Sequence, residues 1–302
     1  MKTKSLVTGG AGFIGSNLVD KLLTMGHEVI VIDNQFSEAH DQFYWNFHSK
    51  NYRMDIRDYS LTRKLYDGVD YVFHLAAEAR IQPAIENPIE AVSINSIGTC
   101  TVLQCAREAG VKRVMYSSTS SGYGMNEPPN VETQPDDCLN PYSVSKVNGE
   151  KLCRMYTSLY GLETVCFRYF NVYGNRQPLK GQYAPVIGIF LRQLAAGEPL
   201  TIVGDGEQRR DFTHVDDVVN ANIKAALANI DDKCFGQVYN VGTGLNHSIN
   251  EIAAMISDNK INISARPGEA KISLANNTKL RETFDWEPTV KLEDWIKDAL
   301  NG

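Results

Sequence analysis

Thr8-Gly9-Gly10-Ala11-Gly12-Phe13-Ile14-Gly15 decides the fold, because of the sequence on either side of it. The run from Lys4 to Thr8 before it predicts a β-strand. After it, apolar residues at positions 18, 19, 22 and 23 predict a helix that stops near Gly26, and Glu28 to Ile32 predicts a second strand. Strand, glycine turn, helix and strand in this order indicate a parallel, doubly wound α/β sheet.

The glycines of this turn, with the acid that follows the second strand, predict a dinucleotide site. Gly9, Gly12 and Gly15 let the backbone approach a pyrophosphate at the helix N-terminus. Their first gap is one residue longer than in the commoner Gly-x-Gly-x-x-Gly. Asp33 would accept hydrogen bonds from the adenosine ribose, and its charge would repel a 2′-phosphate. The sequence therefore favours NAD over NADP as the cofactor.

The alternation of strands and helices continues through the first half. Strands are predicted over Asn51 to Met54, Asp70 to Ala77 and Arg113 to Ser117, and a long helix over Ala91 to Ala109. Asp55 follows the first of these strands, where its carboxylate could reach an adenine amino group. His74 lies within an apolar run and is interpreted as a core histidine, not as a ligand.

A hydroxyl-rich stretch and a Tyr-x-x-x-Lys pair follow. Residues 117–124 (Ser-Ser-Thr-Ser-Ser-Gly-Tyr-Gly) are expected to form a loop where open α/β sheets bind ligands. A helix from Tyr142 to about Gly161 would place Tyr142 and Lys146 on one face. The ammonium would lower the pKa of the phenol, making Tyr142 a general base that takes a proton from an alcohol. Thr119 could hydrogen-bond the same substrate oxygen.

Composition excludes several classes of function. The 302 residues suit one large or two modest domains, and the net charge of −6 with a pI near 5.6 argues against nucleic-acid binding. No signal peptide or membrane-spanning run is present, so a cytoplasmic protein without a membrane partner is expected. The six cysteines form no Cys-x-x-Cys pair, which indicates reduced thiols and no metal site.

Together these stretches resemble the extended short-chain dehydrogenase/reductase family over nearly the whole chain. The resemblance rests on the glycine turn, His74-Leu75-Ala76-Ala77, the hydroxyl-rich stretch and Tyr142 to Lys146. The second half is similar to nucleotide-sugar enzymes such as UDP-glucose and UDP-N-acetylglucosamine 4-epimerases. The stretches that carry this similarity are Arg168-Tyr169-Phe170-Asn171-Val172-Tyr173-Gly174, Gly204-Asp205-Gly206-Glu207-Gln208-Arg209-Arg210-Asp211-Phe212, His214-Val215-Asp216-Asp217-Val218 and Arg266-Pro267-Gly268-Glu269.

The resemblance implies a Rossmann fold that binds NAD and a UDP-sugar, with Thr119, Tyr142 and Lys146 as catalytic residues. The expected cofactor contacts are Gly9, Gly12, Phe13, Ile14, Gly15, Asp33, Asn34, Asp55, Ile56, Leu75, Ala76, Ala77, Asn95, Ser117, Tyr142, Lys146 and Tyr169. The expected substrate contacts are Thr119, Tyr142, Asn171, Arg210, Arg266, Glu269 and Ser273. Both arginines are planar, permanent cations suited to a diphosphate.

By the same resemblance, Asn171 would contact the nucleotide sugar and Tyr169 would lie near the nicotinamide. Glu269 would bind the uridine ribose, although an aspartate is more usual at that position.

Ser120 and Ser121 help to separate the subfamilies. Similar 4,6-dehydratases carry an Asp-Glu pair at these positions, and UDP-glucuronate decarboxylases usually carry a Glu. A 4-epimerase needs no carboxylate there, because it only removes and returns one hydride at C4. In the expected cycle, Lys146 and the positive nicotinamide keep the pKa of Tyr142 low, and its phenolate takes the proton of the sugar 4-OH. The keto sugar then turns about its diphosphate linkage and takes the hydride back on the other face.

The identity of the sugar stays open. A small residue at Ser273, where similar epimerases restricted to UDP-glucose carry a tyrosine, favours UDP-GlcNAc and UDP-GalNAc, with UDP-Glc and UDP-Gal also accepted. The alternative is a 4-epimerase of UDP-glucuronate or an N-acetylated uronate, with Arg80, Arg176 or Arg192 binding the carboxylate. Another NAD-dependent nucleotide-sugar oxidoreductase or dehydratase, and a non-catalytic NAD-binding sensor, are further alternatives.

Two domains and a homodimer are expected. Residues 1–174 would bind NAD, with segments near 211–241 returning to pack on this domain, and residues 175–302 would bind the nucleotide sugar. By resemblance, the helices over 91–109 and 142–160 would pair across a two-fold axis. The apolar candidates for that contact are Leu103, Val147, Leu152 and Met155.

Overall fold

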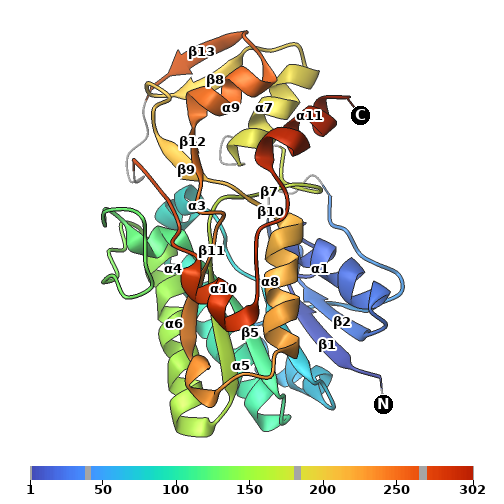
Figure 1. Ribbon diagram of the computed structural model, residues 1–302. Helices are drawn as coiled ribbons and strands as arrows, with labels where there is room; N and C mark the ends of the chain where they lie inside the picture. The colour runs from blue at the N-terminus through green and yellow to red at the C-terminus, as the bar shows by residue number, and fades with distance from the viewer. Residues whose placement is uncertain (1, 38–41, 180–184, 265–270, 302) are drawn as a thin grey trace.

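The computed structural model describes residues 2–37, 42–179, 185–264 and 271–301. Its centre is a seven-stranded sheet in the order β11-β6-β5-β4-β1-β2-β3, in which every neighbouring pair is parallel (Figure 1). The strands are β1 (Lys4–Thr8), β2 (Glu28–Asp33), β3 (Lys50–Arg53), β4 (Tyr71–His74), β5 (Arg113–Thr119), β6 (Glu163–Tyr169) and β11 (Gln237–Val241). This topology confirms the predicted parallel, doubly wound α/β fold.

Helices cover both faces of this sheet because both faces are apolar. Successive strand residues point to opposite faces, so Leu6 and Val7 enter two different buried clusters. The cluster of Val7 includes residues of α1 (Phe13–Thr24), α8 (Val215–Leu227) and α10 (Thr278–Phe284). The cluster of Leu6 includes residues of α5 (Thr99–Glu108) and α6 (Pro141–Tyr160), with α2 (Tyr59–Thr62) beside them. The sequence had placed α10 in the second domain, whereas it packs on the first.

A smaller unit lies beyond the carboxyl ends of the strands, at the top of Figure 1. Its buried cluster joins residues of its three helices to residues of short strands. Its elements are α7 (Val186–Ala195), α9 (Ile249–Ile256), α11 (Leu292–Asn301), the parallel pair β8 (Leu200–Val203) and β13 (Lys260–Ile263), and the antiparallel pair β9 (Arg209–Asp211) and β12 (Asn246–Ser248). The short pair β7 (Val172–Tyr173) and β10 (Thr213–His214) lies between the two units.

The helix predicted over 91–109 is not regular. The chain forms α3 (Ile81–Glu86), α4 (Pro88–Val92), a π-helical segment η2 (Ser93–Gly98) and then α5. Two of the proposed dimer contacts are also corrected: Leu103 and Val147 are buried within the single chain, so neither can face a partner. Leu152 and Met155 are partly buried against the same core.

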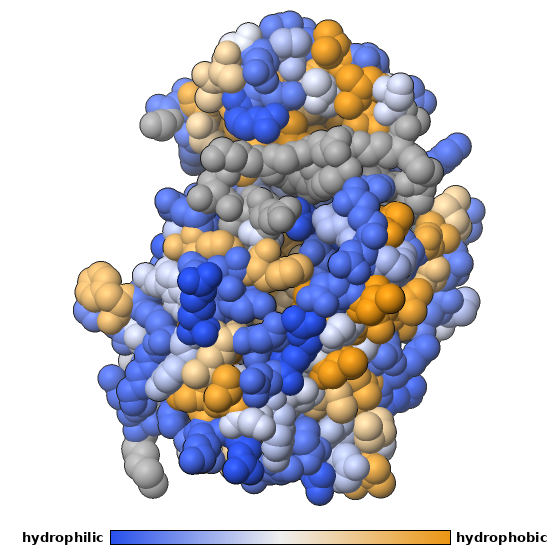
Figure 2. All heavy atoms as spheres, turned by 180° about the vertical axis from the view of Figure 1, so that it is seen from behind, coloured by the Kyte–Doolittle hydropathy of each residue, from blue (hydrophilic) through white to orange (hydrophobic). Residues whose placement is uncertain are grey.

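The surface is mostly hydrophilic, with scattered hydrophobic residues, on the face opposite to that of Figure 1 (Figure 2). Within the described ranges, no helix has the length and apolar character that a bilayer crossing requires. The six cysteines are free thiols. The described residues contain no group of acids, histidines and cysteines that could hold a metal ion.

Candidate active site

A cavity of about 580 Å³ lies at the carboxyl ends of the central strands and extends to the smaller unit. The glycine turn after β1, the ends of β2, β4, β5 and β6, and helix α6 all contribute lining residues. The predicted site residues that line it are Gly9, Gly12, Phe13, Ile14, Gly15, Asp33, Asn34, Asp55, Ile56, Leu75, Ala76, Ala77, Ser117, Thr119, Tyr142, Lys146, Tyr169, Asn171 and Arg210. One cavity thus brings together most of the cofactor, catalytic and substrate residues that the sequence indicated.

The glycine turn fits a pyrophosphate because side chains are excluded from it. Gly9 has a φ of +69°, and a Cβ there would lie 2.7 Å from the backbone nitrogen of Ala76. A Cβ on Gly15 would lie 2.1 Å from the carbonyl oxygen of Gly9. The turn therefore packs tightly against the end of β4, with the N-terminus of α1 facing the cavity. Its unpaired N–H groups and the helix dipole suit a pyrophosphate.

Two carboxylates lie near this turn, at the ends of neighbouring strands. Asp33, at the end of β2, accepts hydrogen bonds from the backbone N–H groups of Ala11 (3.1 Å) and Gln35 (2.7 Å), which fix its orientation beside the glycine turn. Asp55 pairs with Arg57 at 2.7 Å, and this guanidinium holds the pKa of Asp55 below its usual value. Both acids therefore suit the ribose and adenine contacts expected of them.

Helix α6 carries the Tyr-x-x-x-Lys pair, and its start is well defined by local sequence. Asn140 and Ser143 form a capping box, and Pro141 occupies the first helical turn, where its missing N–H costs nothing. The helix ends at Gly161, whose φ is +71°. Tyr142 therefore sits in the first turn of a long, packed helix, so its ring is held at the edge of the cavity.

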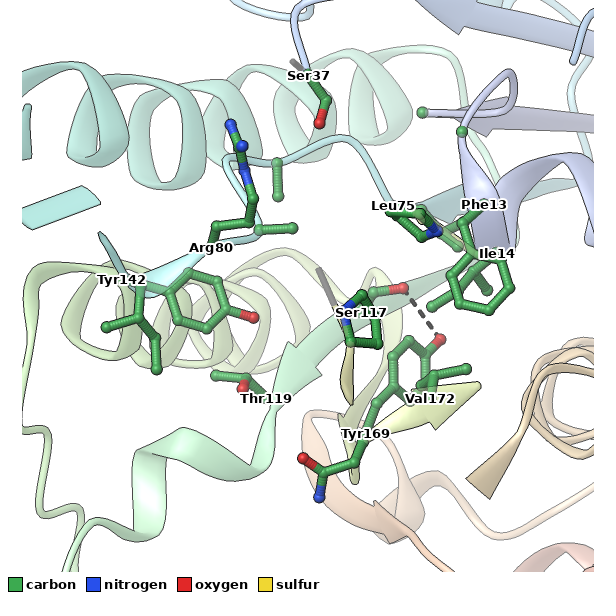
Figure 3. A pocket seen from close by; sticks show the side chains of 18 of the residues that line it. Phe13, Ile14, Ser37, Leu75, Arg80, Ser117, Thr119, Tyr142, Tyr169 and Val172 are labelled. Atoms are coloured by element: carbon green, nitrogen blue, oxygen red, sulfur yellow. Dashed lines mark hydrogen bonds between the residues drawn. The ribbon is translucent and has the colours of Figure 1, made fainter. Parts of the chain in front are cut away.

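Thr119 is the last residue of β5, not a loop residue, since the strand continues to it. It is buried, and its hydroxyl accepts a hydrogen bond from the backbone N–H of Ser121 at 3.1 Å. Figure 3 shows the hydroxyl groups of Thr119 and Tyr142 near each other in the pocket. The two are therefore placed to meet one substrate oxygen.

A low pKa was expected for Tyr142, and this expectation is wrong for the protein alone, whose own groups raise the pKa. Desolvation raises the pKa of this phenol; the hydrogen bond with Thr119 lowers it, and the charge of Glu78 raises it further. Lys146 is buried, and its Nζ lies 4.5 Å above the ring of Tyr116. Burial lowers the pKa of Lys146 to about 8. Desolvation therefore outweighs any help that the phenolate receives from this ammonium.

Tyr169 lies at the end of β6, next to the cavity. Its hydroxyl pairs with Ser117 at 3.0 Å (Figure 3). It also accepts a hydrogen bond from the Asn222 side chain at 2.8 Å. Burial raises its pKa to about 12. Tyr169 is thus a fixed, neutral residue of the pocket lining. Tyr142 is the tyrosine whose hydroxyl lies beside that of Thr119.

On the substrate side, Asn171 connects two of the predicted residues. Its side-chain nitrogen donates to the backbone oxygen of Asp211 (2.9 Å) and to the Ser273 hydroxyl (3.2 Å). Ser273 itself does not line the cavity but contacts Asn171, which does. Arg210 lines the cavity. Arg266 and Glu269 lie outside the described residues.

Asn95 was predicted to contact the cofactor, but it does not line the cavity. Its side chain lies in the π-helical segment, accepts from the backbone N–H of Glu78 (2.9 Å) and donates to the Glu78 carbonyl (3.0 Å) and the Ser145 hydroxyl (2.9 Å). All of its donors and its acceptor are used within the protein. It therefore ties the segment after β4 to the catalytic helix, and the irregular helix is what brings it there.

A buried ionic network also supports the catalytic helix. Arg168 on β6 pairs with Glu150 on α6 at 2.7 Å and with Asp136 at 2.8 Å, and Glu150 accepts a hydrogen bond from Ser118. Arg168 and Glu150 are both almost completely buried. The network links α6 to β5 one residue before Thr119, so it fixes the strand end relative to Tyr142.

Many of the lining residues, most of them apolar, were not predicted from the sequence. Those near the cofactor half are Phe36, Ser37, Phe43, Met54, Ala79, Ile81, Gln82 and Ile94; Arg80, named above as a possible carboxylate ligand, and Ser118, of the hydroxyl-rich stretch, also line the cavity. Those toward the smaller unit are Val172, Tyr173, Pro178, Pro185, Val186, Ile187, Ile189, Thr201, Val203, Gln208, Phe212 and Ile249. Gln82 carried a usable signal, since it is a polar residue in the segment that follows the buried strand β4 at the carboxyl edge of the sheet.

Comparison with known proteins agrees with this geometry. The model of the NAD dependent epimerase/dehydratase family matches residues 5–242. The chain is 36% identical over 306 residues to a putative UDP-glucose 4-epimerase of Methanocaldococcus jannaschii, covering 98% of this chain and 97% of that protein. It is 35% identical over 323 residues to the UDP-N-acetyl-alpha-D-glucosaminuronate decarboxylase of Bacillus cytotoxicus, covering 99% and 97%.

Among solved structures, it resembles the UDP-N-acetylglucosamine 4-epimerase of Methanobrevibacter ruminantium in complex with UDP-N-acetylmuramic acid. The TM-score is 0.91 at 32% identity, covering 100% of this chain and 98% of that one. The fold, the glycine cradle, the Tyr-x-x-x-Lys helix and these similarities agree, and the chain belongs to the NAD dependent epimerase/dehydratase family.

Proposed function

We propose that the protein catalyses the reversible epimerisation of a UDP-hexose at C4, with UDP-GlcNAc and UDP-GalNAc as the preferred pair and UDP-Glc and UDP-Gal also accepted. One observation carries this proposal. The carboxylates among the described lining residues, Asp33 and Asp55, both lie at the adenosine end, and serines occupy positions 120 and 121. The described catalytic end thus offers one base and no second acid–base pair, which suits a reaction confined to C4.

The residues at the catalytic end divide the work. Tyr142 takes the proton of the sugar 4-OH, and Thr119 orients the 4-oxygen and helps to hold its charge. When bound, NAD⁺ supplies the hydride acceptor for C4 and a positive charge beside the phenol. That charge is needed, because the protein alone raises the pKa of Tyr142. Lys146 supports the phenolate as long as it keeps its own proton.

The substrate side must hold the nucleotide while the sugar turns. Arg210, with Arg266, would bind the diphosphate, and Asn171 would contact the sugar. Ser273, which accepts a hydrogen bond from Asn171 at 3.2 Å, supports an N-acetylated sugar by resemblance, because similar epimerases restricted to UDP-glucose carry a tyrosine at this position. Glu269 would bind the uridine ribose. A UDP-glucuronate 4-epimerase is the second candidate: Arg80, a cation in the cavity lining, is the observation that favours it, and the Glu78 carboxylate that pairs with Arg80 is the observation that opposes it.

A substrate panel tests the proposal. The purified protein is incubated separately with UDP-GlcNAc, UDP-Glc and UDP-GlcA without added cofactor, and the products are separated by chromatography. We expect an equilibrium mixture of C4 epimers, most rapidly from UDP-GlcNAc. Unchanged substrates in all three reactions would refute the proposal in favour of a non-catalytic NAD-binding protein. A product of altered mass would refute it in favour of a dehydratase, decarboxylase or reductase.

A further inference from the structure

Among the lining residues that the structure describes, one cation is accounted for neither by the cofactor nor by the diphosphate. The charged residues among the described lining residues are Asp33, Asp55, Arg80, Lys146 and Arg210. The two acids belong to the adenosine end, Lys146 to the catalytic helix and Arg210 to the diphosphate. Arg80 remains, and Figure 3 shows it on the same side of the pocket as Tyr142.

Arg80 is paired with a buried acid, Glu78. One Glu78 carboxylate oxygen accepts hydrogen bonds from the Arg80 backbone N–H at 3.1 Å and from its Nε at 3.3 Å. The side chains are 18% and 8% exposed for Arg80 and Glu78, respectively, so solvent screens the pair only weakly. Glu78 does not itself line the cavity. Arg80 therefore lines the cavity as one half of an ion pair whose net charge is zero.

Hydrogen bonds through Asn95 connect the backbone of Glu78 to the catalytic helix. Asn95 binds both backbone polar groups of Glu78 and also the hydroxyl of Ser145. Ser145 in turn donates to the backbone oxygen of Tyr142 at 2.8 Å. These bonds connect the backbone of Glu78 to the helix that carries Tyr142, so they fix where the pair begins relative to the catalytic tyrosine.

We propose that Glu78 and Arg80 together select the substrate by its charge, so that the site binds an uncharged hexose more tightly than a uronate. This inference rests on the proposed UDP-sugar substrate and deepens it. A hydroxyl or N-acetyl oxygen accepts a hydrogen bond from Arg80 without needing net positive charge. A carboxylate at the same place meets the repulsion of Glu78 as well as the attraction of Arg80, so its desolvation is not offset.

UDP-glucose and UDP-glucuronate are the test ligands, since they differ only at C6. Their dissociation constants are measured by calorimetry on the NAD-loaded wild type and on Glu78→Gln, which keeps the shape of Glu78 and an acceptor oxygen. The wild type should bind UDP-glucose more tightly. Glu78→Gln should shift the ratio of constants toward UDP-glucuronate by about tenfold, the effect of one charge-assisted hydrogen bond.

Three further variants make the result specific. Glu78→Gln combined with Arg80→Gln should lose the shift, and Arg80→Gln alone should move the ratio away from UDP-glucuronate. Glu86→Gln is the matched control, because Glu86 is exposed on α3 and the substitution changes the net charge equally. Its ratio should equal that of the wild type. The thermal midpoint of each variant checks folding, and the Arg80→Gln result decides the matter if Glu78→Gln does not fold.

An unchanged ratio in Glu78→Gln, a shift that persists in the double variant, or a wild type that prefers UDP-glucuronate would overturn the inference. Binding does not require turnover, so the two proposals fail separately. A shifted ratio in a protein that epimerises nothing would leave the charge assignment standing and refute the proposed reaction. Epimerisation with an unchanged ratio of dissociation constants would leave the proposed reaction standing and refute the charge assignment.

Discussion

Replacing Gly15 with alanine tests the dinucleotide cradle at the point where the backbone is most crowded. The new Cβ would lie 2.1 Å from the carbonyl oxygen of Gly9 and 2.8 Å from the Cα of Gly10. Real Cβ contacts are essentially never below 3.0 Å, so the first turn of α1 must move by about 0.9 Å relative to the glycine turn. That movement is enough to break a hydrogen bond between a helix N-terminal N–H and a phosphate.

The expected cost is one charge-assisted hydrogen bond, about 2 kcal/mol, or about 30-fold in the Kd for NAD. Titration calorimetry of the NAD-free protein measures it. Gly26→Ala is the matched control: nothing lies within 4 Å of its Cβ, although its φ is +85°. The control should lose about 1 kcal/mol of stability and keep its affinity for NAD. If Gly15→Ala bound NAD as tightly as the wild type, the cradle would not depend on this close contact, and the reasoning would fail.

Four other outcomes follow from the structure. Tyr142→Phe should lower turnover about 10²- to 10⁴-fold with nearly unchanged UDP-sugar affinity, since it removes only the base, and steady-state rates near those of the wild type would contradict this. Burial lowers the pKa of His74 to about 3 from 6.5, so the unfolded chain binds the extra proton as the pH falls below 6.5. Stability should fall there by about 1.4 kcal/mol per pH unit, and urea unfolding at two pH values should show a smaller difference in His74→Gln. Glu150→Ala should cost about 3 kcal/mol, because it removes the hydrogen bonds of Glu150 to the buried Arg168 and leaves Asp136 as its remaining acidic partner, whereas Glu28→Ala, at an exposed ion pair, should cost about 1 kcal/mol or less; equal losses in thermal unfolding would contradict this. A homodimer is expected through the exposed apolar residues of α4, η2 and α6, so Ile97→Glu, at a side chain 58% exposed, should sediment as a monomer, and an unchanged sedimentation coefficient would exclude that face.

The fold could be predicted because its signals are local. The glycine turn, the strand before it and the acid after the next strand together permit one arrangement, a parallel sheet with a nucleotide at its carboxyl edge. The helix from Pro141 to Tyr160 was equally accessible, since its cap and its terminal glycine are both visible in the sequence. The π-helical segment over 93–98 was not visible, because it depends on contacts of Asn95 with residues far along the chain.

The sign of the pKa shift at Tyr142 could not be obtained from the spacing of Tyr142 and Lys146. Spacing gives the face of a helix but not the degree of burial. In the folded chain desolvation is the larger effect, and Lys146 lies against the ring of Tyr116. The charge of Glu78, 64 positions before Tyr142, adds to that effect.

Residues of the substrate side were predicted only where the sequence matches the motifs of similar nucleotide-sugar enzymes. Asn171, Arg210 and Ser273 lie far apart in the sequence, only Arg210 belongs to a strand, and all three were named because they match a known pattern. The apolar residues of α7, β8 and α9 that close the cavity carry no such pattern, because any buried cluster of a small unit would look the same in sequence. Glu78 was missed for a related reason: a lone acid after a strand gives no sign of the arginine that it neutralises.

The origin of the hydrogen at C4 tests the central claim most directly. The NAD-loaded protein is incubated with UDP-GlcNAc deuterated at C4, in ordinary water and without added cofactor, and the product is examined by NMR. Because the account has one hydride leave C4 and return to it, the epimer should carry deuterium at C4 in full, with no exchange at C3 or C5. An epimer that had lost the label to solvent would show that a proton, not a hydride, leaves the sugar, and would contradict the account.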